Sequence, residues 1–220
     1  MEEKKQKLKK NDFVEIEYTG KTKDGEIFDT NIEEEAKKIN LDIKTRPLII
    51  CLGQNMILPS IDEFLIGKEI GEYILELFPE KAFGNRNRNL VKTMPLSVFS
   101  KHNIKPEKGM VFTFDDMFGK VLSSGSRVIV DFNNPIAGKE VVYELKIKKI
   151  ITDIDNEIKS LMLSFFRQEF QFEVKEKKLI IKLQKQDLTI KPLIELFKEK
   201  FKEILNLELE VTEVEKEEKT

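Results

Sequence analysis

The fold of this chain is decided by one stretch, Tyr18-Thr-Gly-Lys-Thr-Lys-Asp24-Gly25-Glu-Ile-Phe28-Asp29-Thr30. Apolar residues lead into it at alternate positions, Val14, Ile16 and Tyr18, which predicts a half-buried strand. Asp24-Gly25 is a hairpin turn signal, and Ile27 begins the returning strand. The two strands are therefore expected to present three side chains near one mouth: Tyr18, Phe28 and Asp29.

Three further blocks follow in a fixed order. The first is Arg46-Pro-Leu-Ile-Ile-Cys-Leu-Gly53-Gln-Asn-Met-Ile57-Leu58-Pro59-Ser60-Ile61-Asp62-Glu63-Phe64-Leu65-Ile66-Gly67. The others are Gly71-Glu72 and Phe78-Pro79-Glu80-Lys81-Ala82-Phe83-Gly84. Together with the opening stretch they match the ordered pattern YTG, DG-x-x-FD, LG, a short helix after a turn, GE and PE-x-AYG. The chain thus resembles the FKBP family of peptidyl-prolyl cis/trans isomerases.

The resemblance implies an α+β fold in which an FKBP-like antiparallel sheet wraps a short helix. It also implies an isomerase (rotamase) that acts on X-Pro bonds without a cofactor or a metal. The residues that fall on the family's catalytic positions are Tyr18, Phe28, Asp29, Leu58, Phe83 and Tyr143. Those that fall on substrate-binding positions are Leu48, Ile50, Ile57 and Ile61, with Ile61 on the pocket floor.

The chemistry of X-Pro rotation suits such an apolar site. The planar amide loses its resonance midway, at a cost of roughly 18–20 kcal/mol, and the twisted form is less polar, so a dry aromatic pocket favours it. No proton moves, so Asp29 is not expected to be a general base. Taken alone, Tyr18 and Phe28 are typical of ordinary core packing, and Asp29 of a turn or cap.

The sequence departs from the family pattern at three positions. Phe83 replaces the Tyr of AYG, Ile61 replaces a frequent Trp, and Ser60 replaces a Gly. We expect retained activity, altered substrate preference and weak macrolide binding.

A small β-rich segment interrupts the resembling region after Gly84. Residues 85–134 separate the main part, 1–84, from a closing strand within 135–152, and Asn133-Asn-Pro-Ile-Ala-Gly138 resembles the rejoining point of SlyD-like members. The resemblance implies an insert-in-flap domain that holds unfolded chains as a chaperone. Its candidate chaperone surface is Met94, Phe99, Met110, Phe112, Phe114, Met117 and Phe118, although each of these is equally consistent with a small core.

Residues 153–220 form a third segment, which would make this the long, archaeal form of the family. Apolar residues from Ile154 to Phe166 mark one helix face, Phe170–Val174 and Leu179–Leu183 alternate as a hairpin, and a second helix and a last strand follow Pro192. The predicted order is α-β-β-α-β, in a C-terminal α/β domain. So small a unit has little core of its own, so a homodimer through 153–220 is plausible. The tail from Glu213 to Thr220 is predicted to fray.

Composition bounds the remaining possibilities. The 38 basic and 40 acidic side chains are mixed and give a net charge of −2, so no nucleic-acid partner is expected. No run reaches the roughly 18 apolar residues of a membrane span, so no membrane partner is expected. Cys51 is predicted to be a buried thiol, and His102 has no neighbour at metal-ligand spacing. With no signal-like apolar segment, we expect a cytoplasmic protein whose partners are unfolded or nascent chains.

Two alternatives to the isomerase stay open at this point. One is a holdase chaperone that binds chains with little or no turnover. The other is a ribosome-associated nascent-chain factor, for which the basic stretch Lys4 to Lys10 leaves room.

Overall fold

The computed structural model describes residues 6–41, 48–101, 103–114 and 117–214. His102, the start of the basic stretch and the tail 215–220 lie outside the described residues. The chain divides into two compact units. The first comprises residues 1–17, 46–72 and 146–220, and the second comprises residues 18–45 and 73–145.

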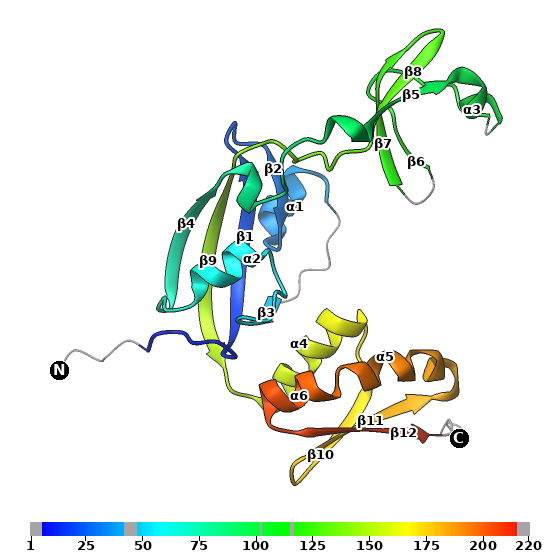
Figure 1. Cartoon of the computed structure of the whole chain (residues 1–220). Coiled ribbons are helices and arrows are strands. Elements are labelled where there is room, and N and C mark those ends of the chain that lie inside the picture. The colour runs from blue at the N-terminus through cyan, green and yellow to red at the C-terminus, as the bar shows by residue number, and fades with distance from the viewer. Residues whose placement is uncertain (1–5, 42–47, 102, 115–116, 215–220) are drawn as a thin grey trace. The chain divides into compact units, whose positions relative to one another are not determined.

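The described residues form a mixed α+β structure with three sheets, which confirms the predicted class (Figure 1). The first sheet has the order β2-β1-β9-β4, with β3 also paired to β1. The others have the orders β5-β8-β7-β6 and β10-β11-β12. The strands of the first sheet are β1 (Phe13–Thr22), β2 (Ile27–Thr30), β3 (Leu48–Cys51), β4 (Gly71–Leu77) and β9 (Val141–Ile151).

The predicted hairpin is present as antiparallel β1 and β2. Its turn is closed by the N–H of Gly25, which donates to the carbonyl of Thr22 at 2.8 Å. Gly25 has φ +88°, a left-handed conformation that suits glycine at this position. The helix α1 (Glu33–Lys38) follows, with three acidic residues in its first turn and two lysines in its last, as the helix dipole favours.

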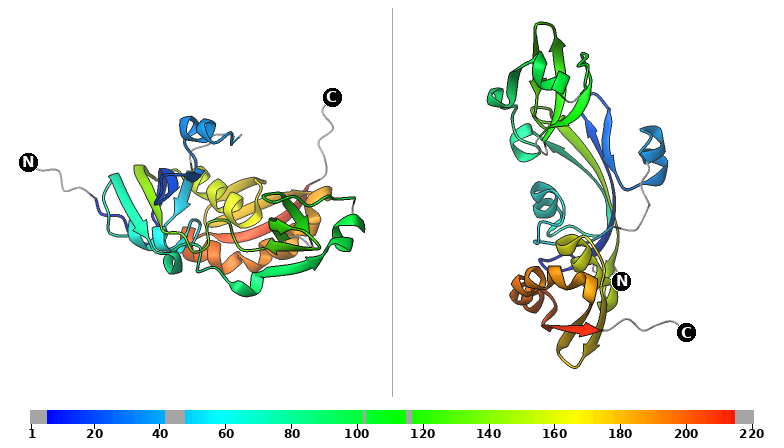
Figure 2. Two further views of the ribbon diagram at one scale, coloured as in Figure 1. Left: turned by 90° about the horizontal axis from the view of Figure 1, so that it is seen from above. Right: turned by 90° about the vertical axis from the view of Figure 1, so that its right-hand side faces the viewer.

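The first unit holds β3, the short helix α2 (Pro59–Leu65) and the C-terminal elements. The C-terminal elements are α4 (Ile154–Phe166), β10 (Gln171–Lys175), β11 (Lys178–Gln184), a 3-10 helix (Lys185–Ile190), α5 (Lys191–Leu196), α6 (Lys198–Leu205) and β12 (Glu208–Val214). The helices α4, α5 and α6 lie on one face of the sheet β10-β11-β12 (Figures 1 and 2). The second predicted helix is broken at Phe197, which caps both α5 and α6.

One apolar core runs through this unit. It joins Phe13 of β1 and Cys51 of β3 to the buried face of α4 and to β11 and β12. Cys51 is buried, as predicted, and burial raises the pKa of its thiol to about 12. The N-terminus of α4 is capped by Asp153, whose carboxylate accepts from the N–H of Asn156 at 3.0 Å. The sequence 153–214 therefore shares a core with β1 and β3.

The second unit contains the sheet β5-β8-β7-β6. Its strands are β5 (Val91–Pro95), β6 (Val111–Phe114), β7 (Met117–Ser124) and β8 (Arg127–Asp131), with α3 (Leu96–Lys101) after β5 and short 3-10 turns at Pro79–Lys81 and Arg88–Leu90. The chain segments that enter and leave this sheet meet at Asp131, which accepts from Arg86 and, at 2.6 Å, from the side-chain amide of Asn133.

Among the described residues, no helix is long and apolar enough to cross a membrane.

Candidate active site

The β1–β2 hairpin positions Tyr18, Phe28 and Asp29. Thr19 pairs with Thr30 and Gly20 with Asp29, but Lys21 pairs with Ile27. Phe28 is therefore an extra residue on β2, a β-bulge. Bulges re-aim a side chain, and here the bulge directs Phe28 toward other aromatic rings.

Four aromatic rings of the second unit form a connected cluster, in which Phe28 contacts two of the other three. The ring of Phe28 makes an edge contact with Phe83, with centroids 5.5 Å apart and planes at 87°. It makes a second edge contact with Tyr143 of β9, at 5.8 Å and 89°. Tyr18 lies 6.3 Å from Tyr143, with planes at 45°. Edge-to-face contacts of this kind are favourable and set ring orientation, so the cluster has a defined geometry.

Gly20 leaves the space that these rings occupy. A Cβ at this position would lie 2.9 Å from Phe28 Cζ and 2.9 Å from Tyr143 Cε1. No side chain other than hydrogen fits there without moving a ring. Sequence reasoning quoted Gly20 in the motif but gave it no role; the close approach depends on the bulge, which the sequence pattern does not reveal.

One carboxyl group belongs to the cluster. The Tyr18 hydroxyl donates to Asp29 Oδ1 at 3.2 Å. Burial raises the pKa of Asp29 above its usual value, although the hydrogen bond from Tyr18 opposes this. Burial, followed by the nearby charge of Asp29, raises the pKa values of Tyr18 and Tyr143. Both phenols therefore keep their protons at neutral pH and can donate hydrogen bonds.

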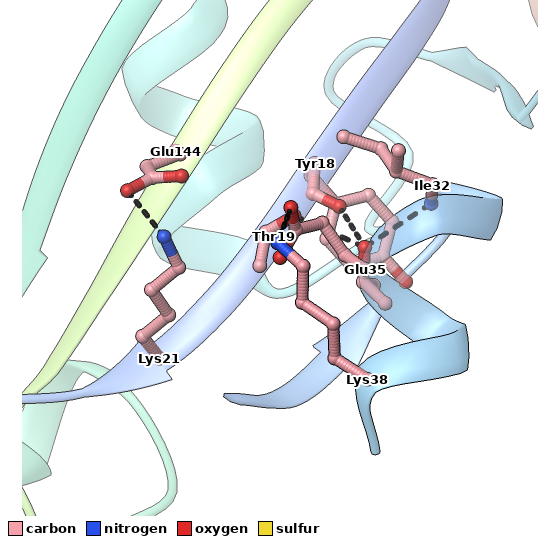
Figure 3. Close-up of polar contacts among 8 residues, drawn as sticks. Tyr18, Thr19, Lys21, Ile32, Glu35, Lys38 and Glu144 are labelled. Atoms are coloured by element: carbon pink, nitrogen blue, oxygen red, sulfur yellow. Dashed lines mark hydrogen bonds and ion pairs between the residues drawn. The ribbon is translucent and has the colours of Figure 1, made fainter. Parts of the chain in front are cut away.

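A second set of polar contacts holds the backbone next to Tyr18 and Thr19 of β1 (Figure 3). The hydroxyl of Thr30 donates to the carbonyl of Tyr18 at 2.9 Å, accepts from the N–H of Ile32 at 3.1 Å and lies 3.0 Å from the hydroxyl of Thr19. The N–H of Tyr18 donates to Asn31 Oδ1 at 2.7 Å. These bonds hold the backbone of β1 at Tyr18 to the residues that follow β2. Lys21, by contrast, pairs with Glu144 at 2.6 Å.

The other predicted site residues belong to the first unit. Leu48, Ile57 and Leu58 are half-buried, and Leu58 is the N-cap of α2. Ile50 and Ile61 are 1% and 0% exposed. Ile50 was expected to contact substrate; it is buried at the position where β3 pairs with Val14 of β1.

Asp62 holds the loop before α2, and sequence reasoning missed it. This carboxylate is 2% exposed and accepts from the N–H groups of Gly53 and Asn55, both at 2.8 Å. Hydrogen bonds from backbone N–H groups to a buried carboxylate are short and strong, so they hold the donating segment in place. Asp62 thereby anchors the segment that carries Ile57 and Leu58.

Metal-binding chemistry has no candidate in the part of the chain that the structure describes. No group of three or more His, Cys, Asp or Glu side chains lies close enough there to hold an ion.

Comparison with known proteins places the chain in a family. The family described as "FKBP26, IF domain" matches residues 92–136. A short-type peptidyl-prolyl cis-trans isomerase from Methanocaldococcus jannaschii is 30% identical over 148 residues, which cover 65% of this chain and 94% of the relative. The FKBP-type isomerase SlyD of Pasteurella multocida is 30% identical over 147 residues, 64% of this chain and 68% of the relative. This chain is an FKBP-type peptidyl-prolyl cis/trans isomerase family member. The SlyD of Aeromonas hydrophila is also similar, at 28% identity over 141 residues, 62% of this chain and 61% of the relative.

The insert of this SlyD-like FKBP divides its apolar residues between a core and a surface. Phe99 is 2% exposed and packs with Val121, Val128 and Val130, so the prediction that it lies on a chaperone surface is corrected: it is a core residue. Its ring contacts Phe112 edge-on at 5.2 Å. Three of the other predicted residues are exposed, namely Met110, Met117 and Phe118, and three are half-buried, namely Met94, Phe112 and Phe114.

Proposed function

We propose that this chain accelerates cis/trans isomerisation of X-Pro bonds in unfolded or partly folded polypeptides and binds such chains as a folding chaperone. The observation that carries the proposal is the cluster of Tyr18, Phe28, Phe83 and Tyr143, in which the Tyr18 hydroxyl donates to the Asp29 carboxyl group. Membership of the FKBP-type family supports the same reaction.

The cluster suits this reaction because rotation needs low polarity more than acid or base. The imide crosses its barrier when it is twisted and least polar, so aromatic walls that exclude water stabilise that state relative to the planar one. Tyr18 remains a proton donor at neutral pH. No bond breaks during rotation, so the reaction calls for no cofactor.

The proposed roles follow the family positions. The catalytic set is Tyr18, Phe28, Asp29, Leu58, Phe83 and Tyr143. In it, Asp29 orients Tyr18, and the backbone N–H at Leu58 holds the substrate carbonyl. The family's substrate-binding positions are taken by Leu48, Ile50, Ile57 and Ile61, of which Ile50 and Ile61 are buried.

A protease-coupled assay of a short X-Pro peptide tests the proposal. We expect wild-type chain to accelerate exchange, and Phe28→Ala and Asp29→Ala to lower kcat/KM. Phe132→Ala is the matched control, since this half-buried insert ring also makes an edge contact, to Phe112 at 6.5 Å. Equal losses in Phe28→Ala and Phe132→Ala would indicate a general effect on folding and contradict the assignment.

A holdase with little turnover is the second candidate, favoured by one observation: Phe83 contributes a ring but no hydroxyl to the cluster. In this case the wild-type chain suppresses aggregation of an unfolded protein while leaving peptide exchange at its uncatalysed rate.

For domain organisation we propose an isomerase domain at 1–84 plus 135–152, an insert chaperone domain at 85–134 and a C-terminal domain at 153–220. Met110, Met117 and Phe118 are 39%, 48% and 72% exposed, which suits contact with varied apolar chains.

In the C-terminal domain, Leu193 and Leu196 are 39% and 80% exposed, which supports pairing with a second copy. Light scattering tests this, and the mass of a single chain would contradict it.

A further inference from the structure

A groove of about 470 Å³ lies between β3 and α4 in the first unit, and none of its lining residues belongs to the ring cluster. One wall is formed by Leu48, Ile49 and Ile50 of β3 together with Met56. The other wall is formed by α4 and the residues after it, from Asn156 to Glu169. The groove therefore joins a strand edge to a helix that lies more than 100 positions later in the sequence.

The outer edge of β3 is a pairing edge. Within the described residues, β1 is the one strand that pairs with β3. The N–H of Leu52 points toward β1, since it donates to the carbonyl of Asp12 at 3.0 Å. The N–H of Cys51 points the opposite way and donates to Met56 Sδ at 3.1 Å. Backbone groups alternate along a strand in an antiparallel pair, so the N–H and C=O of Ile49 share the outward direction of Cys51. Ile49 also lines the groove. An added strand thus finds one donor and one acceptor there.

The helix wall is a polar stripe with an apolar centre. Its lining residues recur at helical spacing, with Lys159 near one end, Leu163 in the middle and Arg167 at the other. Neither Lys159 nor Arg167 forms an ion pair with any described residue. The lining contains a single carboxylate, Glu169, so the groove carries an excess of positive charge.

We propose that this groove binds an extended stretch of client polypeptide, which adds as a strand to the outer edge of β3. Apolar client side chains would lie against Leu163 and Met56, and client carboxylates would lie near Lys159 and Arg167. From Asn156 to Arg167 the helix rises about 17 Å, the length of about five extended residues. The proposal rests on the proposed function only in taking unfolded chains as the ligand; it requires neither proline nor turnover.

Fluorescence anisotropy tests it with two labelled proline-free probes, acetyl-Asp-Val-Thr-Val-Asp-amide and its twin with lysine in place of aspartate. We expect the acidic probe to bind the full chain more tightly. The double variant Lys159→Glu/Arg167→Asn should weaken acidic-probe binding by about tenfold and improve binding of the lysine probe. Lys177→Glu, in the exposed turn between β10 and β11, is the matched control and should leave both affinities unchanged.

Amide hydrogen exchange supplies a second readout. On binding the acidic probe, the Ile49 amide should slow by about tenfold or more, while the amides of Leu48 and Ile50, which already face β1, change little. The proposal is overturned if the two probes bind equally, if Lys177→Glu has the same effect as the double variant, or if the exchange rate of the Ile49 amide does not change. It is also overturned if probe affinity falls as protein concentration rises, because a second copy of the chain then fills the groove. Peptide isomerisation should be unaltered in the double variant, which separates this failure from failure of the isomerase proposal.

Discussion

Gly20→Ala is the substitution that probes the ring cluster most sharply. The added methyl group would lie 2.9 Å from Phe28 Cζ and 2.9 Å from Tyr143 Cε1. Ordinary carbon–carbon contact begins at about 3.5 Å, so both rings would have to retreat by about 0.6 Å or more. Gly20 has no positive φ, so the backbone itself tolerates alanine. The change therefore acts on the rings and on little else.

The expected size follows from overpacking. Inserting a methyl group into a well-packed site costs about 1–3 kcal/mol. If the rings form the surface that stabilises the twisted imide, a similar loss in the transition state lowers kcat/KM by about five- to 160-fold. The free energy of unfolding should fall by about the same 1–3 kcal/mol.

Gly119→Ala is the matched control. A Cβ there would lie 2.8 Å from Phe132 Cε1 and 2.8 Å from Val130 Cγ1 in the insert sheet. Both variants should lose comparable stability in a denaturant titration, but only Gly20→Ala should lose peptide turnover in the protease-coupled assay. Turnover of Gly20→Ala within twofold of wild type, despite a measured loss of stability, would refute the assignment of the site.

Four other changes test separate parts of the account. Burial raises the pKa of Asp29 from 3.8, so the wild-type chain gains stability from the protonated carboxyl below that value and loses it as pH rises. Asparagine does not titrate, so the unfolding free energy of Asp29→Asn minus that of wild type should increase from about pH 3 to pH 7 in urea titrations. A decrease would contradict this. Phe83→Tyr should raise macrolide affinity measured by calorimetry, and nanomolar binding by the wild-type chain would contradict the expected weakness. Deleting 86–133 should reduce catalysed refolding of a protein far more than turnover of a short peptide; equal losses would argue against a chaperone role for the insert. Asp62→Ala leaves two backbone N–H groups without their acceptor and should lower the unfolding free energy by about 2–4 kcal/mol. A loss of less than about 1 kcal/mol, measured by thermal denaturation, would contradict this.

Much of the first sheet was predictable because its signals are local. Alternation around Ile16 and the Asp24-Gly25 turn depend on neighbouring residues, and the hairpin formed as expected. The bulge at Phe28 was not predictable, because it changes register without changing the pattern of apolar residues. It is the bulge that brings Phe28 and Tyr143 into contact across Gly20.

The insert and the C-terminal segment show where pattern reasoning stops. Phe99 and Phe118 look alike in sequence, yet one is 2% and the other 72% exposed, because burial depends on which face of the insert each ring meets. The apolar face after Pro192 predicted one helix, but the chain breaks at Phe197. The groove beside Ile49 depends on a contact between β3 and α4, and no local signal reports a contact over that sequence separation.

The central claim is that the ring cluster itself accelerates rotation about an X-Pro bond. The rate of cis/trans exchange in a short X-Pro peptide, measured by NMR exchange spectroscopy with wild-type and Phe28→Ala chains, tests it most directly. The account predicts strong acceleration by the wild-type chain and a loss of about tenfold or more in Phe28→Ala. Exchange at the uncatalysed rate with the wild-type chain, or undiminished acceleration by the variant, would contradict it.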